Sequence, residues 1–556
     1  MRRLTRLVTA AAVRGVSTGD IISNSFAAST EATEHEAHPL LYHVPVLASR
    51  TVGREAEVRT LWQNLLAGRH LQVLYGMDGI GKSTIAAEFC DTVKHSQRFS
   101  CIQWFNGQHA LASQLQHFFA SMKGRKEKDV LLVVDDVDTP EAVIALIPEH
   151  PNVYLLMTTN AAEVPSNTKL ASLRPSALSP QSSQQFVSEL PFSDELEGVF
   201  HNLGYVPLLM HIASLMIAGE VCSPLQLRRV LEGKEVRKND TLSISGALAV
   251  LLEICIAEME KTYPDARELL RVISCFHAGD ISDAVVDAVV GDPAGRFSVD
   301  AAQLGIFSLK WEENAFALHP LVRKTLQGTL SPSVLSRAAE ALLGLWPRRW
   351  RGMGSQTAYN LVWHTYAICQ RFIECQVPFT PSLITAMDRS AIFLAHVEAR
   401  DLTVAVEMWL RIQHDNDAQQ RPPSTESVRM LRECGRLLHF LKDARAEAVL
   451  QRSWKDSVTV HGRGAAESAL ILGCLAPYLL ATAANMALVD ESVAVLEAHL
   501  TSVDVVLGKE EVRMLWQTIF VLLMCKGQYM TELGLEIPAG LHRALERADA
   551  EVQKVK

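Results

Sequence analysis

Several features that mark particular classes of protein are missing from this sequence of 556 residues. Its 10 cysteines form no CxxC pair and no dense cluster, which excludes a disulfide framework and favours reduced thiols in an intracellular protein. The net charge of −9 argues against a general nucleic-acid binder. With 48% hydrophobic and 21% charged residues, the composition is that of a folded chain of about two to four domains.

Two local patterns depart from this ordinary composition. Residues 346–351, WPRRWR, interleave basic and aromatic side chains, and we favour a solvated helix end or a seam between domains over a nucleic-acid contact. Residues 468–489 carry no charge over 22 positions, long enough to cross a bilayer. This run is rich in alanine and contains Pro477 and Asn485, so it favours two stacked helices, and no membrane span is expected.

The N-terminus is poor in acidic residues, and the first of them is Asp20. Four arginines precede it, beside an apolar helical face: Arg2, Arg3, Arg6 and Arg14. This composition is typical of a mitochondrial presequence, and a disordered basic tail is the alternative. Residues 1–45 are therefore expected to form a presequence-like or disordered segment. The protein is expected to be intracellular, either mitochondrial or cytoplasmic.

Residues 76–84, GMDGIGKST, fit the pattern GxxxxGK[ST] and directly follow an apolar strand pattern at 71–75. Glycines let the backbone fold round phosphate oxygens, with N–H groups and a helix N-terminus facing the negative charge. In such a loop the lysine reaches the β- and γ-phosphates and the next hydroxyl ligates Mg²⁺. The residues expected to bind the nucleotide are Gly76, Met77, Asp78, Gly79, Ile80, Gly81, Lys82, Ser83 and Thr84. The dinucleotide pattern GxGxxG is missing, which disfavours a nicotinamide or flavin cofactor.

A second apolar run, 130–137, contains two aspartates at its end. Asp135 would hold Mg²⁺ together with Ser83, and Asp136 would orient or deprotonate an attacking water, with Lys82 stabilising charge. An ordinary strand that ends in a surface Asp-Asp turn is the alternative. Further strand patterns at 101–105 and 153–159 predict a doubly wound parallel sheet with nucleotide at the carboxyl ends of its strands. No metal beyond Mg²⁺ is expected.

An ordered series of motifs then resembles the NB-ARC module of STAND ATPases over residues 48–330. The series comprises Val52-Gly53-Arg54-Glu55, the loop 76–84, the aspartates 135 and 136, Thr158-Thr159-Asn160, Leu178-Ser179-Pro180, Leu203 to Leu209, and Phe316 to Val322. The resemblance implies that the backbone of Val52, Gly53 and Arg54 lies near adenine and that Pro207 packs against the base. It also implies that His319 touches the β-phosphate of ADP and latches a closed state; a satisfied core histidine is the alternative.

Three departures from the family pattern accompany the resemblance. Asn160 stands where the family has an arginine that reads the γ-phosphate, so the positive charge that the family uses for this reading is missing. Pro320 replaces an acidic residue, and one residue is inserted between Gly204 and the Val206-Pro207 pair. Nucleotide binding is still expected, and turnover by this ATPase site is expected to be slow if it occurs.

The resemblance and the helical pattern beyond it divide the chain into five further units. We expect a P-loop α/β domain at 46–178, a helical subdomain at 179–240, a winged-helix subdomain at 241–330, a helical connector at 331–421 and a TPR-like helical array at 422–556. A repeat with an offset of 46 residues matches Ala448 with Ala494 and Leu450 with Leu496. Small residues at such positions predict close helix stacking, and two unrelated helix pairs are the alternative.

Two functional hypotheses follow. The first is a switch in which ATP and ADP favour different arrangements, with a protein partner bound by the repeats and assembly into homo-oligomers when active. The second is a repeat scaffold in which the nucleotide is structural and poorly hydrolysed. A small-molecule kinase is a distant third, because no lid or acceptor-site pattern is present.

Overall fold

The computed structural model describes residues 40–554, apart from short gaps. The gaps are residues 43, 46–50, 97, 108–110, 123–128, 148–151, 165–169, 188–189, 234–236, 239–240, 292–294, 311–314, 329, 348–354, 399–400, 481 and 502–508. The presequence-like pattern and most of the basic and aromatic segment 346–351 therefore lie outside the described residues.

A parallel six-stranded sheet forms the first unit, with the strand order β1-β3-β4-β5-β2-β6. All four strands expected from the sequence are present, and two short strands, β1 and β6, are added at the edges. The strands are β1 (Leu40–Tyr42), β2 (Leu71–Tyr75), β3 (Phe99–Asn106), β4 (Asp129–Asp135), β5 (Val153–Thr159) and β6 (Leu170–Leu173). Because β5 lies between β4 and β2, the carboxyl ends of these three strands meet at one place.

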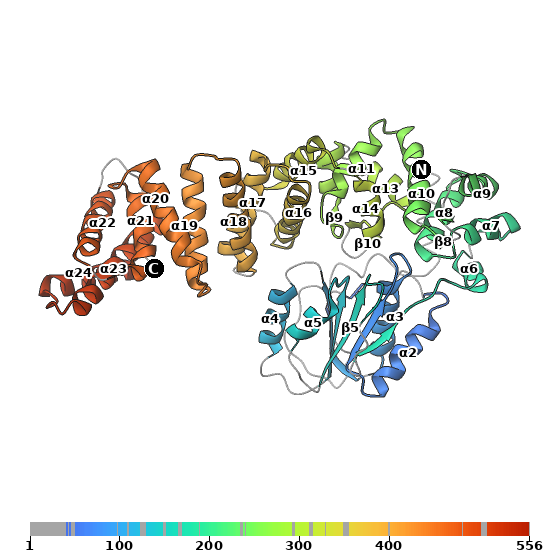
Figure 1. The fold of residues 1–556 in the computed structure, drawn as a ribbon, viewed down its shortest axis with the longest axis horizontal. Coiled ribbons are helices and arrows are strands. Elements are labelled where there is room, and N and C mark those ends of the chain that lie inside the picture. The colour runs from blue at the N-terminus through green and yellow to red at the C-terminus, as the bar shows by residue number, and fades with distance from the viewer. Residues whose placement is uncertain are drawn as a thin grey trace, which may run out of the picture.

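Helices cover both faces of this sheet (Figure 1). On one face α2 (Glu55–Leu66) and α3 (Lys82–Lys94) share a core with alternate strand residues such as Leu156. On the other face α4 (Leu111–Met122) and α5 (Pro140–Leu146) share a second core with Leu155 and Met157. Strands buried on both faces explain the continuous Val/Leu runs in the sequence. The predicted doubly wound α/β fold is confirmed.

A helical unit follows the sheet, and its turns agree with the local sequence. Its helices are α6 (Pro180–Phe186), α7 (Asp194–Asn202), α8 (Pro207–Ala218) and α9 (Pro224–Gly233). As expected, Ser179 caps α6 by accepting a 3.1 Å hydrogen bond from the Ser182 N–H. Between α7 and α8 the chain turns at Gly204 and Tyr205, which adopt φ of 62° and 53°. The turn leaves Pro207 at the first position of α8.

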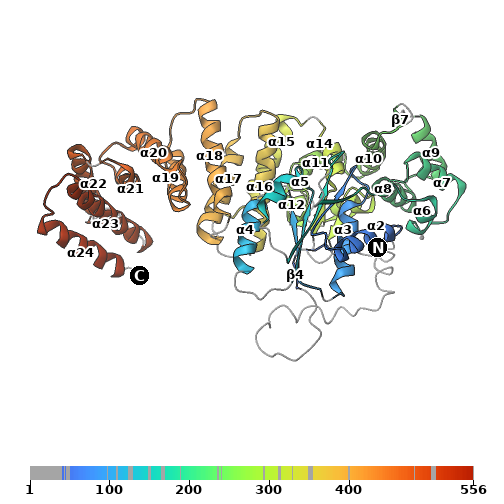
Figure 2. The ribbon, with the colours of Figure 1, turned by 60° about the horizontal axis from the view of Figure 1, so that its bottom comes forward.

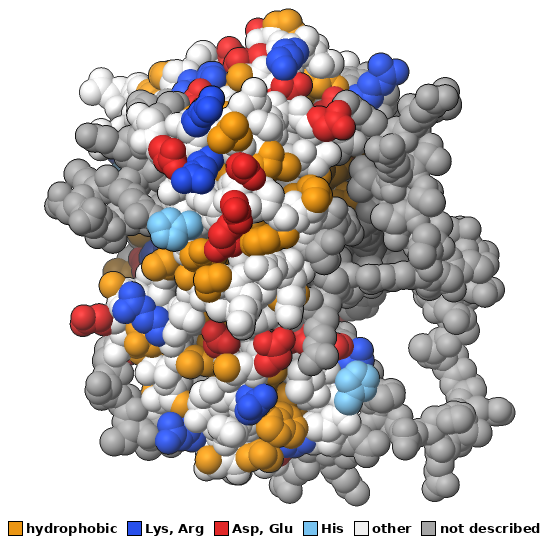
Figure 3. Space-filling view, turned by 90° about the vertical axis from the view of Figure 1, so that its right-hand side faces the viewer, with side chains coloured by type: hydrophobic (Ala, Val, Ile, Leu, Met, Phe, Trp, Pro, Cys, Tyr) orange, Lys and Arg blue, Asp and Glu red, His pale blue; other side chains and the backbone are white. Residues whose placement is uncertain are grey.

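At this end of the molecule, charges of both signs are interspersed on the described side chains (Figure 3). Arg228, for example, forms an ion pair with Glu232 one turn along α9, with a 2.7 Å N–O distance.

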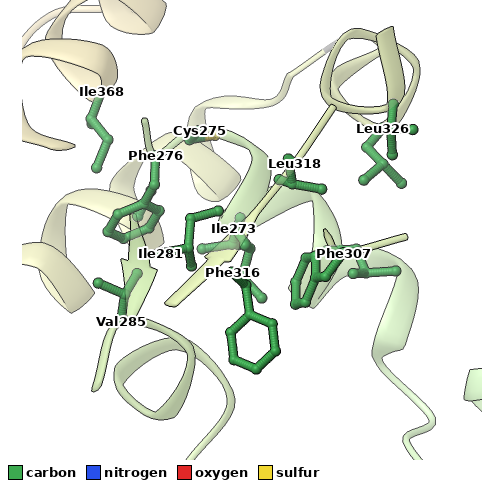
Figure 4. Packing of buried hydrophobic residues seen from close by; sticks show 14 of the residues in the cluster. Ile273, Cys275, Phe276, Ile281, Val285, Phe307, Phe316, Leu318, Leu326 and Ile368 are labelled. Carbon is green, nitrogen blue, oxygen red and sulfur yellow. The ribbon is translucent and has the colours of Figure 1, made fainter. Parts of the chain in front are cut away.

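The next unit combines helices with a small antiparallel sheet of order β10-β11-β9. Its elements are α10 (Ile244–Glu260), α11 (Ala266–Ser274), β9 (Ile281–Ser282), α12 (Asp283–Val290), α13 (Arg296–Gln303), β10 (Ser308–Lys310), β11 (Ala315–Ala317) and α14 (Pro320–Gln327). A two-stranded ribbon, β7 (Arg237–Lys238) and β8 (Thr241–Leu242), precedes it. Figure 4 shows Phe276, Ile281 and Phe316 packed in its core, with Ile368 from the next helical unit at the edge.

A row of helices makes up the rest of the chain and extends away from the sheet unit (Figures 1 and 2). The helices are α15 (Pro332–Leu345), α16 (Ser355–Glu374), α17 (Pro381–Phe393) with the π-helical turn Leu394–Glu398, α18 (Leu402–Ala418), α19 (Thr425–Phe440), α20 (Ala446–His461), α21 (Ala466–Leu475), α22 (Ala483–Thr501), α23 (Lys509–Glu532) and α24 (Ala539–Lys554). The first of them, α15, packs against α11 and α12.

Two sequence features of this row have a structural account. The indole of Trp346 is buried and donates a 3.2 Å hydrogen bond to the Thr365 hydroxyl, so this part of the basic and aromatic segment joins α15 to α16. The uncharged run 468–489 is broken by a 3₁₀ turn at Pro477 into the predicted two helices. Within the part of the chain that the structure describes, no helix is long and apolar enough to cross a membrane.

The repeat positions behave alike in α20 and α22, but not as predicted for the small residues. Leu450 and Leu496 are both fully buried. Ala448 and Ala494 are both exposed, so the prediction that they allow close stacking is wrong. The close approach occurs instead at glycines, since a Cβ on Gly435 would lie 2.5 Å from Cδ2 of Leu450. Helix pairs pack closely here because a side chain is missing, not because one is small.

The hydrophobic cores divide the described residues into bodies. The two cores of the sheet unit are built from residues 61–157 and extend no further than Leu173 at their margins. A separate core runs from Leu178 to Ala446, across the helical unit, the small-sheet unit and the first helices of the row. A third core continues to Ala548. The sheet unit is thus a body of its own, joined to the remainder near residues 174–178.

Candidate nucleotide-binding site

The phosphate loop turns sharply between β2 and α3, and the turn requires glycine. Gly79 and Gly81 have φ of 76° and 97°, in the left-handed region where a Cβ is disfavoured. The ammonium of Lys82 lies back across the loop, donating to the carbonyls of Gly76 at 2.8 Å and Met77 at 2.9 Å. The loop leads directly into the N-terminus of α3, where backbone N–H groups and the helix dipole favour phosphate.

The charge of Lys82 is surrounded by acidic groups. Burial lowers the pKa of the Lys82 ammonium, and the carboxylates of Asp78, Asp136 and Asp135 act in the opposite direction. These carboxylates bring an excess of negative charge next to the loop. A phosphate group would be repelled there without a cation, so the site favours a nucleotide that arrives with a divalent metal.

Asp135 and Ser83, the two residues expected to bind the metal, contact each other. The Ser83 hydroxyl donates a 2.7 Å hydrogen bond to Oδ1 of Asp135, and the Thr158 hydroxyl donates to the same oxygen. Burial raises the pKa of the Asp135 carboxyl, while these hydrogen bonds and the charge of Lys82 act to lower it. A hydroxyl and a carboxylate oxygen at this distance are hard ligands of the kind that Mg²⁺ prefers.

Asp136 occupies a strained and acidic position beside this pair. Its φ is 61°, and its N–H donates a 2.9 Å hydrogen bond to the Thr158 hydroxyl. The amide of Asn160 donates to its Oδ1 at 3.1 Å. Burial, followed by the negative charges of Asp135 and Asp78, raises the pKa of Asp136 to about 6. A carboxylate with this pKa accepts a proton from water more readily than an ordinary aspartate does.

Thr158 joins the two aspartates and was not identified from the sequence as a site residue. Its single hydroxyl donates to Asp135 and accepts from the backbone of Asp136. The available signal was a polar residue at the carboxyl end of a buried strand. Its importance depends on β5 lying between β4 and β2, which the sequence pattern alone does not state.

The entry motif contributes the side chain of Arg54 to the surroundings of the loop. The guanidinium of Arg54 is buried and donates to the Ile80 carbonyl at 2.6 Å and to the Ser176 carbonyl at 2.7 Å. It also pairs with Glu57 at 3.0 Å. Arg54 therefore ties the phosphate loop to the segment that leads out of the sheet unit. At the neighbouring Gly53, a Cβ would lie 2.6 Å from Oγ of Ser182, so the entry motif packs closely on α6.

The helical unit meets the phosphate loop at the start of α8. The Leu208 N–H donates a 3.2 Å hydrogen bond to the Gly79 carbonyl, and a Cβ on Gly79 would lie 3.0 Å from the Leu208 side chain. This contact brings Pro207, the residue before, to the edge of the loop. Of the other predicted loop residues, Met77 and Thr84 are exposed.

His319 approaches the same loop from the small-sheet unit. It caps α14, and its Nδ1 accepts a 3.1 Å hydrogen bond from the Leu321 N–H. Burial, together with the positive charge of Lys82, lowers the pKa of His319 to about 4. The ring is therefore neutral at pH 7, with its proton on Nε2, because Nδ1 is an acceptor. His319 is thus a hydrogen-bond donor close to the charge that would hold phosphate.

These residues fit a magnesium nucleotide. The loop offers N–H groups and an ammonium for phosphate oxygens, and Ser83 and Asp135 offer metal ligands. Among the described residues, no group of three or more His, Cys, Asp or Glu side chains is placed to hold a metal. Magnesium would therefore be held by Ser83 and Asp135 together with phosphate and water oxygens. Val52, Gly53 and Arg54 remain the predicted base contacts.

The fold and this site define a protein with a P-loop α/β domain followed by α-helical units. Neither a protein-family model nor a curated protein sequence matches the chain. A solved structure with a similar arrangement is a Signal Transduction ATPase with Numerous Domains (STAND) protein with a tetratricopeptide repeat sensor from Pyrococcus horikoshii. The match covers 94% of this chain and 78% of that chain, with a TM-score of 0.46 and 15% sequence identity.

Proposed function

We propose that this protein is an ADP/ATP-binding switch of the STAND type, in which the bound nucleotide controls the arrangement of the sheet unit relative to the helical units. One observation carries the proposal. The candidate site is built from two bodies with separate cores: the phosphate loop belongs to the sheet unit, whereas Leu208 packs against the core that starts at Leu178 and His319 directly follows Leu318 of that core. A ligand that contacts both bodies can shift their arrangement through contacts that differ between states.

The two nucleotides would be distinguished by different side chains. His319, a neutral donor, suits the β-phosphate of ADP and would hold the helical units against the loop. Lys82, Ser83 and Asp135 suit the terminal phosphate and its magnesium. Loss of the γ-phosphate on hydrolysis would change which set of contacts dominates. The small-sheet unit that contains His319, which we propose to be a winged-helix subdomain, would then change its position relative to the loop.

Hydrolysis in this proposal is slow. A bound magnesium nucleotide would supply the γ-phosphoryl group and a charge-neutralising cation. Lys82 stabilises the negative charge on the phosphate oxygens, and Asp136 orients the attacking water and accepts its proton. Asn160 brings no positive charge to the γ-phosphate, which is the reason to expect slow turnover.

The row of helices from α15 to α24 is the proposed partner-binding part, because stacked helix pairs usually present an extended surface to a protein. Assembly of the active form into homo-oligomers belongs to the same proposal.

A scaffold with a structural nucleotide is the second candidate. The unbroken core from Leu178 to Ala446 supports it, because a rigid body of this length could present the repeats without any switching. In that case ATP would be held without turnover, and removal of Lys82 would unfold the sheet unit without affecting partner binding.

The first test is to release and identify the nucleotide from purified protein and to measure ATP hydrolysis by the wild type and Asp136→Ala. Tightly bound ADP, with slow hydrolysis that the substitution abolishes, is the expected result. ATP bound without turnover would favour the scaffold. If no nucleotide is bound and neither Mg-ADP nor Mg-ATP raises the melting temperature, the proposal fails.

A further inference from the structure

Arg174 lies beside the phosphate loop and was not identified from the sequence as a site residue. It directly follows β6, which pairs with β2 so that Leu173 lies opposite Leu74. A Cβ added at Gly76, the first residue of the loop, would lie 3.5 Å from Cγ of Arg174 and 3.9 Å from its Nε. The Arg174 side chain therefore passes along the start of the loop. The inference drawn from this contact rests on the proposed nucleotide site.

The start of the loop has a strand end on each side. Because β2 lies between β5 and β6, the residues that follow these two strands lie on opposite sides of Gly76. On the β5 side, the Gly76 N–H donates a 3.3 Å hydrogen bond to the Thr159 carbonyl, and the next residue is the uncharged Asn160. On the β6 side, the next residue is Arg174. A positive charge is thus missing at the end of β5 but present at the end of β6.

The backbone on both sides of Arg174 is held in place, whereas its side chain is not. Leu173 is paired in the sheet, and Pro175 is buried. The Ser176 carbonyl accepts a 2.7 Å hydrogen bond from Arg54. The Arg174 side chain is exposed, and no described residue forms a hydrogen bond or an ion pair with it. Since a guanidinium carries several N–H donors and no acceptor, these donors are available to an anionic ligand at the loop.

The charges around the loop favour a second cation for such a ligand. Lys82 donates to the Gly76 carbonyl at 2.8 Å, and Arg174 lies where Gly76 has no side chain, so both cations approach the same residue. Three carboxylates surround the charge of Lys82, those of Asp78, Asp136 and Asp135. The phosphates of a nucleotide would add more negative charge. A guanidinium close to them would strengthen binding, because hydrogen bonds between charged groups are stronger than neutral ones.

We propose that Arg174 is a phosphate-binding residue, which contacts the phosphate groups of ADP and ATP from the β6 side of the loop while Lys82 holds them from within it. Arg174 also begins the segment 174–178, which joins the sheet unit to the remainder of the chain. A phosphate contact at Arg174 therefore acts directly on the joint between the two bodies. The competing account is that only the alkyl part of Arg174 matters, by packing on Gly76.

The first test measures the binding of fluorescent Mg-ADP and Mg-ATP to variants of the full chain. Arg174→Met keeps an unbranched stem without the charge, and Arg174→Lys keeps the charge without the planar donors. The matched control is Arg69→Met, which removes an exposed arginine near the opposite end of β2. We expect Arg174→Met to raise both dissociation constants about tenfold or more, and Arg174→Lys to recover part of this loss. Arg69→Met should match wild type. Equal binding by Arg174→Met and wild type would overturn the proposal.

Two further measurements separate a phosphate contact from a structural role. Without nucleotide, urea unfolding of Arg174→Met should match wild type, because the side chain has no partner among the described residues. Raising NaCl from about 50 to about 500 mM should weaken Mg-ADP binding more in wild type than in Arg174→Met, since one exposed charge contact is lost. A variant that is destabilised without nucleotide, or that keeps the full dependence on salt, would contradict the proposal.

Chemical modification locates the contact in the wild type. Phenylglyoxal reacts with accessible arginine side chains, and mass spectrometry of the digested protein gives the extent of reaction at each arginine. Saturating Mg-ADP should protect Arg174 and leave Arg69 as reactive as before. If Mg-ADP binds and Arg174 is not protected, this inference fails while nucleotide binding stands. If the wild type binds no nucleotide, both fail.

Discussion

The hydroxyl of Ser83 lies 2.7 Å from Oδ1 of Asp135, although 52 positions of the chain separate the two residues. Ser83 is the second residue of α3, the helix after the phosphate loop, and Asp135 is the last residue of the strand β4. The contact forms because β5 alone lies between β2 and β4, so both carboxyl ends face one point. The strand order thus brings together the two residues that we propose as metal ligands.

Ser83→Ala should weaken magnesium-dependent binding selectively. We expect the affinity for Mg-ATP to fall about tenfold, because one metal ligand is lost, while affinity in EDTA changes little. Titration with fluorescent ATP, with and without Mg²⁺, measures both. Thr92→Ala, an exposed residue on the same helix, is the control. Equal losses with and without Mg²⁺ would show that Ser83 acts through the loop and not through the metal.

His319→Ala should speed the release of ADP. Loss of one donor to the β-phosphate corresponds to about 1 kcal/mol, or a several-fold faster dissociation. Stopped-flow displacement of fluorescent ADP measures the rate, and His414→Ala, exposed on α18, is the matched control. If the release of ADP is unchanged, His319 is only the cap of α14.

Acid should destabilise the body whose core runs from Leu178 to Ala446, because three of its histidines have lowered pKa values. Burial is the main reason that the pKa values of His277, His319 and His364 are each lowered to about 4. Unfolded histidines have a pKa of about 6.5, so between pH 6.5 and 4 the unfolded state binds protons that the folded state does not. The free energy of unfolding should therefore decrease as the pH is lowered from 6.5 to 4, by up to about 1.4 kcal/mol per pH unit for each histidine.

Urea unfolding at pH 7, 6 and 5 measures this slope. His364→Gln should lower stability at pH 7, because His364 accepts a hydrogen bond from the His277 N–H at 3.2 Å, but it should flatten the dependence on pH. Asp280 and Arg323 act in opposite directions on the pKa of His364 and are kept unchanged in this test. A slope that His364→Gln does not alter would contradict the assignment.

Arg54→Lys should destabilise the site although the charge is kept. A lysine ammonium does not reproduce the guanidinium geometry that reaches the carbonyls of Ile80 and Ser176 together. A loss of about 2–3 kcal/mol in unfolding of the sheet unit is expected, with weaker ADP binding. Thermal melting with and without Mg-ADP measures both. The exposed Arg59→Lys on α2 should match wild type, and an equally stable Arg54→Lys would contradict the linking role.

Gly435→Ala should destabilise the helical row and leave nucleotide binding unchanged. The added Cβ would lie 2.5 Å from Cδ2 and 2.6 Å from Cγ of the buried Leu450, so either this side chain or the helices α19 and α20 must shift. A cost of about 1–3 kcal/mol is expected. Gly344→Ala in α15 meets nothing within 4 Å and should instead stabilise by about 0.5–1 kcal/mol. Circular dichroism melts compare the two, and an opposite order would refute the packing account.

Much of the sheet unit was predictable because its signals are local. The Val/Leu runs of β2 and β5 coincide with the predicted strands 71–75 and 153–159, since burial on both faces demands continuous apolar residues. The edge strands β1 and β6 were missed, because they are three and four residues long and pair on one side only. Short strands carry too few residues to show a pattern.

The motifs of the site were predictable from the sequence, but the contacts between these motifs were not. The loop and the aspartates follow from spacing, whereas the role of Thr158 depends on strand order and that of Arg54 on packing against a segment more than 100 positions away. The exposed repeat alanines show the same limit, because periodicity gives a helix face but not the neighbour that covers it.

Because α15 packs against α11 and α12, the first helix of the row is fixed to the unit that contains His319, and the rest of the row moves with it. From α15 to α24, each helix packs on neighbours in the chain, so a tilt at the base is carried outward only as far as every joint is stiff. At a given angle, displacement grows with distance from the pivot. A turn of a few degrees at the phosphate loop, too small to alter the local packing much, would therefore sweep the tip at α24 through a far larger arc.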